Sequence, residues 1–164
     1  MDRQNQIIRL ILKRLGIINS GKDILERMIL RKIIYLVQSA GLRLGYYFSW
    51  YLNGPYCKDL LYVDDILQQH DCDEDVIIDE QSLNILERIK SLFEVPAECK
   101  FDDLYSWLEL LSSVHFLINK RQVSSLNHNT TINEILIILD RYEKKYTIEQ
   151  VEFALEELKN TKIL

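Results

Sequence analysis

The 164-residue sequence is poor in glycine, proline and cysteine, with five, two and three residues of each. Because glycine and proline supply most tight turns, their scarcity favours long helices over many short strands. The cysteines, Cys57, Cys72 and Cys99, are odd in number and far apart, so neither a disulfide framework nor a Cys-x-x-Cys zinc site is expected. Free thiols of this kind are typical of a reducing cytoplasm, where we expect the protein to reside.

The sequence also lacks long apolar runs and the short motifs of known enzyme classes. It has no apolar stretch of 18 residues and no signal-peptide pattern, so we expect neither export nor a membrane span. It has no glycine-rich phosphate loop, no Gly-x-Ser-x-Gly and no His-Glu-x-x-His. We therefore expect a protein that is not an enzyme and that uses no cofactor and no metal. The cluster His70-Asp-Cys-Asp73 is interpreted as a solvated acidic loop, because one loop rarely provides metal geometry without further ligands.

Apolar residues at helical spacing predict a mainly α fold, one compact multi-helix domain over residues 1–164. The expected helices, about seven, cover residues 2–15, 22–40, 57–69, 82–93, 102–120, 131–145 and 147–159. Asp102 is the expected N-cap of the helix over 102–120. Capping boxes at Thr131 and Thr147 are expected to open the last two helices.

The net charge of −5 is distributed unevenly along the chain. Residues 1–45 hold nine Lys/Arg against three Asp/Glu, whereas the remainder holds eleven against twenty-two. We expect Arg27 and Arg31 on the outer face of the helix over 22–40, opposite its apolar stripe. If the first two helices pack side by side, a basic patch for nucleic acid would comprise Lys13, Arg14, Arg27 and Arg31. Against that alternative stands the overall acidity, because dedicated DNA-binding domains are commonly strongly basic.

Five aromatic side chains lie within six positions, from Tyr46 to Tyr51, and Asn53-Gly-Pro55 follows as an expected turn. This density predicts a short β element near residues 46–52 that anchors a core. Because strand side chains alternate, one face would hold Tyr47, Ser49 and Tyr51 and the other Phe48, Trp50 and Leu52.

Roles for this aromatic segment follow from the expected alternation. Residues expected to be structural are Phe48, Trp50, Gly54 and Pro55. Tyrosine is favoured in protein interfaces because it offers a large contact area at a low entropic cost. Residues expected to bind a partner protein are Tyr46, Tyr47, Tyr51, Tyr56 and Lys58. The alternative stays open that all these tyrosines pack beneath neighbouring helices.

The helix over 102–120 carries two further residues that we interpret as structural, Trp107 and His115. His115 lies on the apolar stripe, where a hydrogen-bonded core histidine is the default interpretation. Glu109 lies six positions earlier and therefore points to a different side, so the two cannot form an acid–base pair by themselves. We expect Glu109 to form a partly buried ion pair with a basic group of the helix over 22–40, such as Lys32.

Four segments together resemble the YwgA-like bacterial and archaeal proteins, which in turn resemble the Panacea domain of SocA-like antitoxins. The segments are Arg31-Lys-Ile-Ile-Tyr-Leu-Val-Gln38, Phe48-Ser-Trp-Tyr-Leu-Asn-Gly-Pro-Tyr56, Trp107-Leu-Glu-Leu-Leu-Ser-Ser-Val-His-Phe116 and Tyr146-Thr-Ile-Glu-Gln-Val-Glu-Phe-Ala-Leu-Glu-Glu-Leu158. The resemblance spans about residues 24–160. One departure is Cys57-Lys-Asp59, where family members tend to place a serine after the Gly-Pro-Tyr, so a polar role of that serine does not transfer.

The resemblance implies a helical domain without catalytic activity that acts by protein contact. Panacea-type members neutralise toxins, and others occur in defence-related settings. It therefore implies an antitoxin of a toxin–antitoxin system, or an accessory protein of antiviral defence, whose partner is a toxin or effector protein. A nucleic-acid-binding regulator and a homo-oligomer stay open as alternatives.

Overall fold

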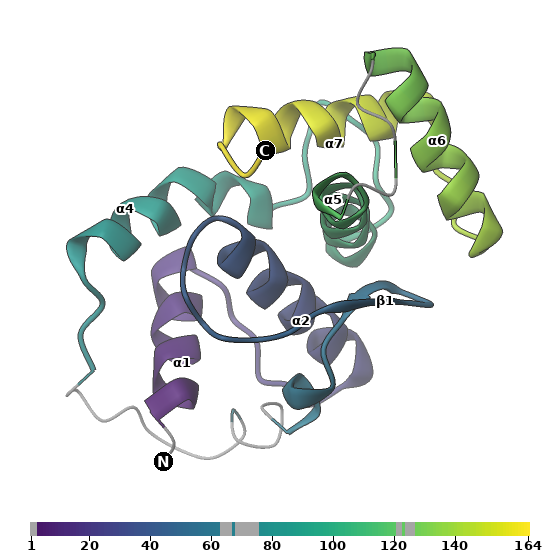
Figure 1. The fold of residues 1–164 in the computed structure, drawn as a ribbon. Helices are drawn as coiled ribbons and strands as arrows, with labels where there is room; N and C mark the ends of the chain where they lie inside the picture. The colour runs from purple at the N-terminus through teal and green to yellow at the C-terminus, as the bar shows by residue number, and fades with distance from the viewer. Residues whose placement is uncertain (1–2, 63–66, 68–75, 121–122, 124–126) are drawn as a thin grey trace. The chain divides into compact units, whose positions relative to one another are not determined.

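The computed structural model describes residues 3–62, 67, 76–120, 123 and 127–164 (Figure 1). The chain folds into two compact units. Unit 1 comprises Met1–Phe48 and Cys57–Phe93, and unit 2 comprises Ser49–Tyr56 and Glu94–Leu164. The chain thus contributes eight residues to unit 2 and then returns to unit 1. The expected single domain over residues 1–164 stays a prediction.

The prediction of a mainly helical fold is confirmed. In the described part of the chain the helices are α1 (Arg3–Leu15), α2 (Ile24–Ser39), α4 (Glu80–Ile89), α5 (Leu104–Asn119), α6 (His128–Arg141) and α7 (Ile148–Asn160). A β-hairpin, β1 (Ser49–Tyr51) and β2 (Gly54–Tyr56), and two 3-10 turns, η1 (Lys58–Leu61) and η2 (Lys90–Phe93), complete it. No described helix combines the length and apolarity needed to cross a bilayer. Of the helix expected over 57–69, the structure describes the η1 turn, and most of the remainder lies outside the described residues.

Helix α2 of unit 1 is buried on more than one of its faces. Its N-cap is Asp23, whose side chain accepts a hydrogen bond from Glu26 N at 2.8 Å. The six consecutive residues 32–37 are all buried, which a helix packed on a single face could not achieve. Of the expected basic outer face, Arg27 and Arg31 do lie on the less buried side of α2, but both are only partly exposed.

The C-terminal end of α2 packs against α4 within the same unit. The guanidinium of Arg88 donates to Ala40 O at 3.0 Å and thereby satisfies a carbonyl at the helix terminus. The following residue, Gly41, has φ +123°. This backbone conformation favours glycine, and a Cβ there would also press on Ile85 Cδ1, 3.3 Å away. Helix α4 also contacts α1.

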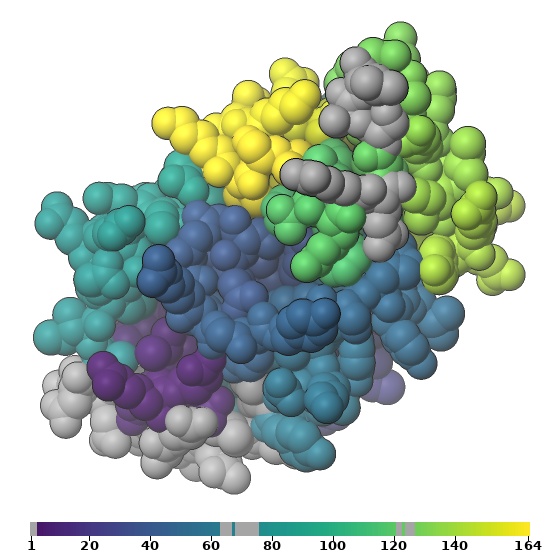
Figure 2. Space-filling model, viewed as in Figure 1, coloured from purple at the N-terminus to yellow at the C-terminus, as the bar shows by residue number. Residues whose placement is uncertain are grey.

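Helix α5 is the central element of unit 2. All eleven residues from Trp107 to Leu117 are buried, which exceeds the single stripe expected from the sequence. Helix α7 and strand β2 both pack against α5, and α6 packs against α7; Figures 1 and 2 show α6 in green beside α7 in yellow. The N-cap of α5 is Asp103, whose side chain accepts a hydrogen bond from Ser106 N at 2.7 Å. The expected N-cap was Asp102.

Caps fix the start of the two last helices, one as expected and one not. The capping box of Thr147 and Gln150 is confirmed, with both reciprocal hydrogen bonds formed. The one expected at Thr131 is wrong, because Asn127 caps α6 earlier by accepting from Thr130 N at 2.8 Å. Thr131 is instead buried in the helix, and its hydroxyl donates to Asn127 O at 3.0 Å.

Candidate interaction surfaces

The aromatic segment forms a β-hairpin instead of one strand followed by a turn. The strands are antiparallel, with Trp50 opposite Pro55 and Tyr51 opposite Gly54. The connection is therefore Leu52–Asn53, one position before the start of the expected turn, and Gly54 opens the second strand with φ +81°. The short second strand escapes prediction because proline is uncommon inside strands.

Trp50 anchors the hairpin within unit 2. Its ring centroid lies 5.6 Å from that of Phe116 on α5 and 5.5 Å from that of Tyr142, which follows α6. Aromatic pairs at these separations contribute about 0.5–1.5 kcal/mol each beyond the area that they bury. Gly54 and Pro55 are also buried. The inner side of the hairpin is thereby held in place.

The outer side of the hairpin presents three apolar or aromatic residues, Tyr51, Leu52 and Tyr56, which we call the hairpin face. Tyr51 is 57% exposed and Leu52 62% exposed, while Tyr56 is half-buried. The rings of Tyr51 and Tyr56 lie 5.3 Å apart with an interplanar angle of 37°. Leu52 was expected on the inner side with Trp50; the connection turns it outward. No residue from Ser49 to Tyr56 carries a charge.

The other predicted partner-binding residues belong to unit 1. Gln38 holds the backbone of Tyr46 by donating to its carbonyl at 2.7 Å and accepting from its amide at 3.0 Å. Tyr47 is 78% exposed, and Lys58 is exposed at the start of η1. Phe48, predicted as structural, is buried with its ring edge-on to Tyr35 at 5.0 Å. The aromatic run from Tyr46 to Tyr51 is therefore divided between the two units: Tyr46 to Phe48 belong to unit 1, and the residues from Ser49 onward belong to unit 2.

The predicted basic residues differ in how they are held. Lys13 and Arg14 are exposed at the C-terminal end of α1, where the helix dipole stabilises positive charge. Arg27 donates through Nε to Gly21 O at 2.9 Å. Arg31 is half-buried. The exposed part of the predicted patch thus reduces to Lys13 and Arg14.

The remaining histidine and cysteine candidates give no reactive cluster in the described part of the chain. His115 is buried, and desolvation lowers its pKa to about 4 despite a hydrogen bond with the backbone of Ile163. Cys57 and Cys99 are free thiols, and burial raises the pKa of Cys99. No group of three or more metal-ligating side chains occurs among the described residues. The cluster His70–Asp73 lies outside them.

A buried polar cluster in unit 2 centres on Glu109, which pairs with the ammonium of Lys144. Both side chains are almost fully buried, with 7% and 9% of their surfaces exposed. Two tyrosines lie beside the carboxylate, and burial first, then Glu109, raises the pKa of both Tyr105 and Tyr146. Tyr146 OH also donates to Ser106 O at 3.2 Å. Glu109 is therefore in a buried ion pair, but the partner that the structure gives it is Lys144, which lies between α6 and α7 and not on the helix expected over 22–40. The pairing with Lys32 stays a prediction.

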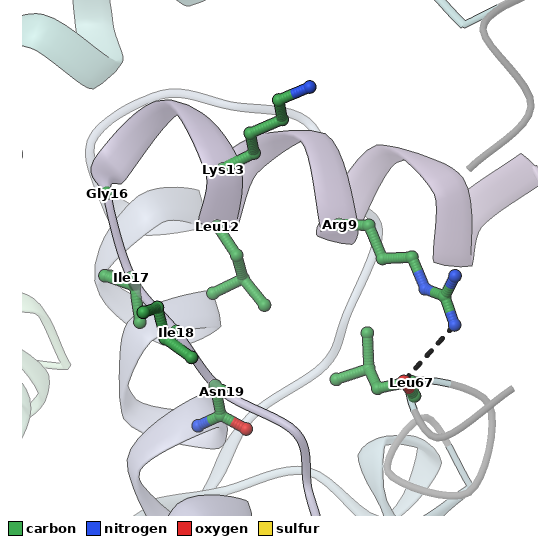
Figure 3. A pocket seen from close by; sticks show the side chains of 8 residues that line it. All are labelled: Arg9, Leu12, Lys13, Gly16, Ile17, Ile18, Asn19 and Leu67. Atoms are coloured by element: carbon green, nitrogen blue, oxygen red, sulfur yellow. Dashed lines mark hydrogen bonds between the residues drawn. The ribbon is translucent and has the colours of Figure 1, made fainter. Parts of the chain in front are cut away.

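A second feature that the sequence does not reveal is a pocket at the C-terminal end of α1, shown in Figure 3. Its volume is about 480 Å³. The described residues that line it are Arg9, Leu12, Lys13, Gly16, Ile17, Ile18, Asn19 and Leu67. Only Lys13 among them was a predicted site residue, because the pocket depends on the chain reversal after Gly16.

Comparison of the chain with protein-family models, curated proteins and solved structures gives no match. The functional interpretation therefore depends on the geometry of the chain itself. The resemblance to the YwgA-like and Panacea-domain proteins stays a prediction.

Proposed function

We propose that this protein is a non-enzymatic protein-interaction module, an antitoxin-like or defence-associated accessory protein that binds and regulates a toxin or effector. The hairpin face is the observation that supports the proposal. Trp50 is packed between Phe116 and Tyr142 while Tyr51 and Leu52, its chain neighbours, are mostly exposed. An apolar surface held rigidly in this way loses little conformational entropy when a partner covers it.

The hairpin face has the composition of an interface core. Interface cores are enriched in aromatic residues and depleted in charges, and this face has two tyrosines, a leucine and no charge. Fully burying a side chain such as Leu52 contributes about 1.5–3 kcal/mol. A partner that covers Leu52 together with Tyr51 would therefore gain most of its affinity from these two residues, as in other hot spots.

The test is co-expression with the product of the neighbouring gene. We expect a complex that survives purification at physiological salt and rescue of the host from that product's toxicity. The double variant Tyr51→Ala/Leu52→Ala is expected to abolish both, because it removes the outer side chains and leaves Trp50 in place. The control is Ile148→Ala, another apolar residue of unit 2, which is 53% exposed. Absence of both complex and rescue with the unaltered protein would contradict the proposal.

Nucleic-acid binding is a second candidate, and the adjacent exposed cations Lys13 and Arg14 favour it. A contact of this kind would weaken with salt, with a slope of about −0.9 per phosphate neutralised. Two cations predict a slope of about −2 at most. In gel shifts across a salt series, we expect Lys13→Ala/Arg14→Ala to remove any binding and Arg27→Ala to change it little. Binding that ignores both salt and these substitutions excludes this candidate.

A further inference from the structure

The pocket at the end of α1 combines an aliphatic lining with a cationic one. The aliphatic side chains come from Leu12 and Leu67, which face the hollow in Figure 3, and from Ile17 and Ile18. Arg9 and Lys13 supply the positive charge. The volume of about 480 Å³ falls within the range of small-molecule sites, which is about 300–1,000 Å³. All these residues belong to unit 1.

Several hydrogen bonds fix the walls of this pocket in advance. Arg9 donates to Leu67 O at 3.2 Å, drawn as the dashed line in Figure 3. Gly16, with φ +70°, turns the chain, and Ile17 N donates to Leu12 O at 2.9 Å. Asn19 Nδ2 donates to Glu26 O at 2.8 Å. A ligand would therefore meet a preformed surface and would not have to order the loop.

The loop holds one aliphatic side chain almost entirely in water. Ile18 is 99% exposed, the highest value of any large apolar residue in the described part of the chain. Its neighbours are fixed nevertheless: Asn19 is bonded as above, and Ser20 N and Oγ donate to the Glu26 carboxylate at 3.2 and 2.6 Å. The hydrogen bond from the Ser20 side chain is the main cause that lowers the pKa of Glu26. An ordered backbone thus presents Ile18 to solvent, where an apolar ligand would cover it.

We propose that this pocket binds a small amphiphilic anion, an aliphatic chain that ends in one carboxylate or phosphate group. Charge complementarity selects the anion, because Arg9 and Lys13 are the only charged residues among the described lining residues. The flexible stem of Lys13, which extends outward from the rim in Figure 3, lets its ammonium turn toward an anion at the mouth. The described lining contains no aromatic ring on which a base could stack, so it favours an aliphatic ligand over a nucleotide. This site shares no residue with the hairpin face and does not depend on the proposed function.

Calorimetric titration of the full chain with dodecanoate, below its micelle concentration, tests the proposal. We expect saturable binding at one site per chain. Dodecyltrimethylammonium, with the same chain and the opposite charge, is expected to bind at least tenfold more weakly, and inorganic phosphate likewise. If the cationic amphiphile or phosphate alone binds as tightly as dodecanoate, or if dodecanoate does not saturate, the proposal is wrong.

Two variants with matched controls locate the binding. Lys13→Glu is expected to weaken dodecanoate binding by about fivefold or more, since it replaces attraction by repulsion near the anion. Ile18→Ser should weaken it by a similar factor through lost apolar contact. The controls are Lys22→Glu and Ile77→Ser, an exposed cation and an 89% exposed isoleucine of the same unit that do not line the pocket. Equal loss in the controls, or none in either test variant, would overturn the assignment, and thermal melts confirm that each variant is folded.

Discussion

Glu109→Gln is expected to lower the free energy of unfolding by about 3–5 kcal/mol, the usual cost of removing one partner of a buried ion pair. The substitution leaves the ammonium of Lys144 almost fully buried without its countercharge. It also weakens the electrostatic contacts with Tyr105 and Tyr146. Urea unfolding followed by far-ultraviolet circular dichroism measures the change.

A more exposed polar contact of the same unit provides the control. His128 Nε2 lies 3.9 Å from Glu152 Oε1, and about half of each side chain is exposed. Glu152→Gln should therefore cost less than about 1 kcal/mol. Adding Lys144→Met to Glu109→Gln should recover part of the loss, because it removes the unpaired charge. A loss below about 1 kcal/mol for Glu109→Gln would mean that the pair is solvated and not a buried part of unit 2.

Acidification from pH 7 to pH 4 is expected to destabilise the protein through His115 by about 3 kcal/mol, because each unit of pKa shift corresponds to about 1.4 kcal/mol. Burial lowers the pKa of His115 from 6.5 to about 4 in the folded protein. The unfolded chain therefore binds a proton that the folded chain excludes between these values. The contribution of His115 to the free energy of unfolding is present above pH 6.5 and is lost as the pH falls through about 4.

The variant His115→Asn separates this contribution from the titration of carboxylates. Its free energy of unfolding, measured at a series of pH values, should vary less between pH 6.5 and pH 4 than that of the unaltered protein. The matched control is His128→Asn, which replaces another histidine of the same unit whose side chain is about half exposed. The same pH profile for His115→Asn and the unaltered protein would show that the histidine is not desolvated.

Local sequence signals predicted the helices well, and the caps show where such signals stop. The box Thr147–Gln150 was readable because both partners lie within one turn. At α6, however, Asn127 caps the helix four residues before the expected Thr131. Asparagine is as good a cap as serine or threonine, so propensity alone could not choose between them.

Contacts between residues that are far apart in the chain could not be predicted from the sequence. Lys144 is 35 positions from Glu109, and no periodicity links them. The enclosure of α2 and α5 was also missed, because an apolar stripe shows which face is buried but not that polar residues such as Ser112 are buried as well. The alternation of exposed Ser49 and Tyr51 with half-buried Trp50, by contrast, was predicted correctly from strand geometry.

The most direct measurement of the central claim is the affinity of the purified protein for its co-expressed partner, compared between Leu52→Ala and Ile148→Ala. The two residues have similar exposure, at 62% and 53%, and both belong to unit 2. If the hairpin face binds the partner, Leu52→Ala should raise the Kd by about tenfold or more, the effect of a hot-spot residue, and Ile148→Ala should leave it unchanged. An unchanged Kd for Leu52→Ala and Tyr51→Ala alike, in a complex that forms, would show that the partner binds elsewhere.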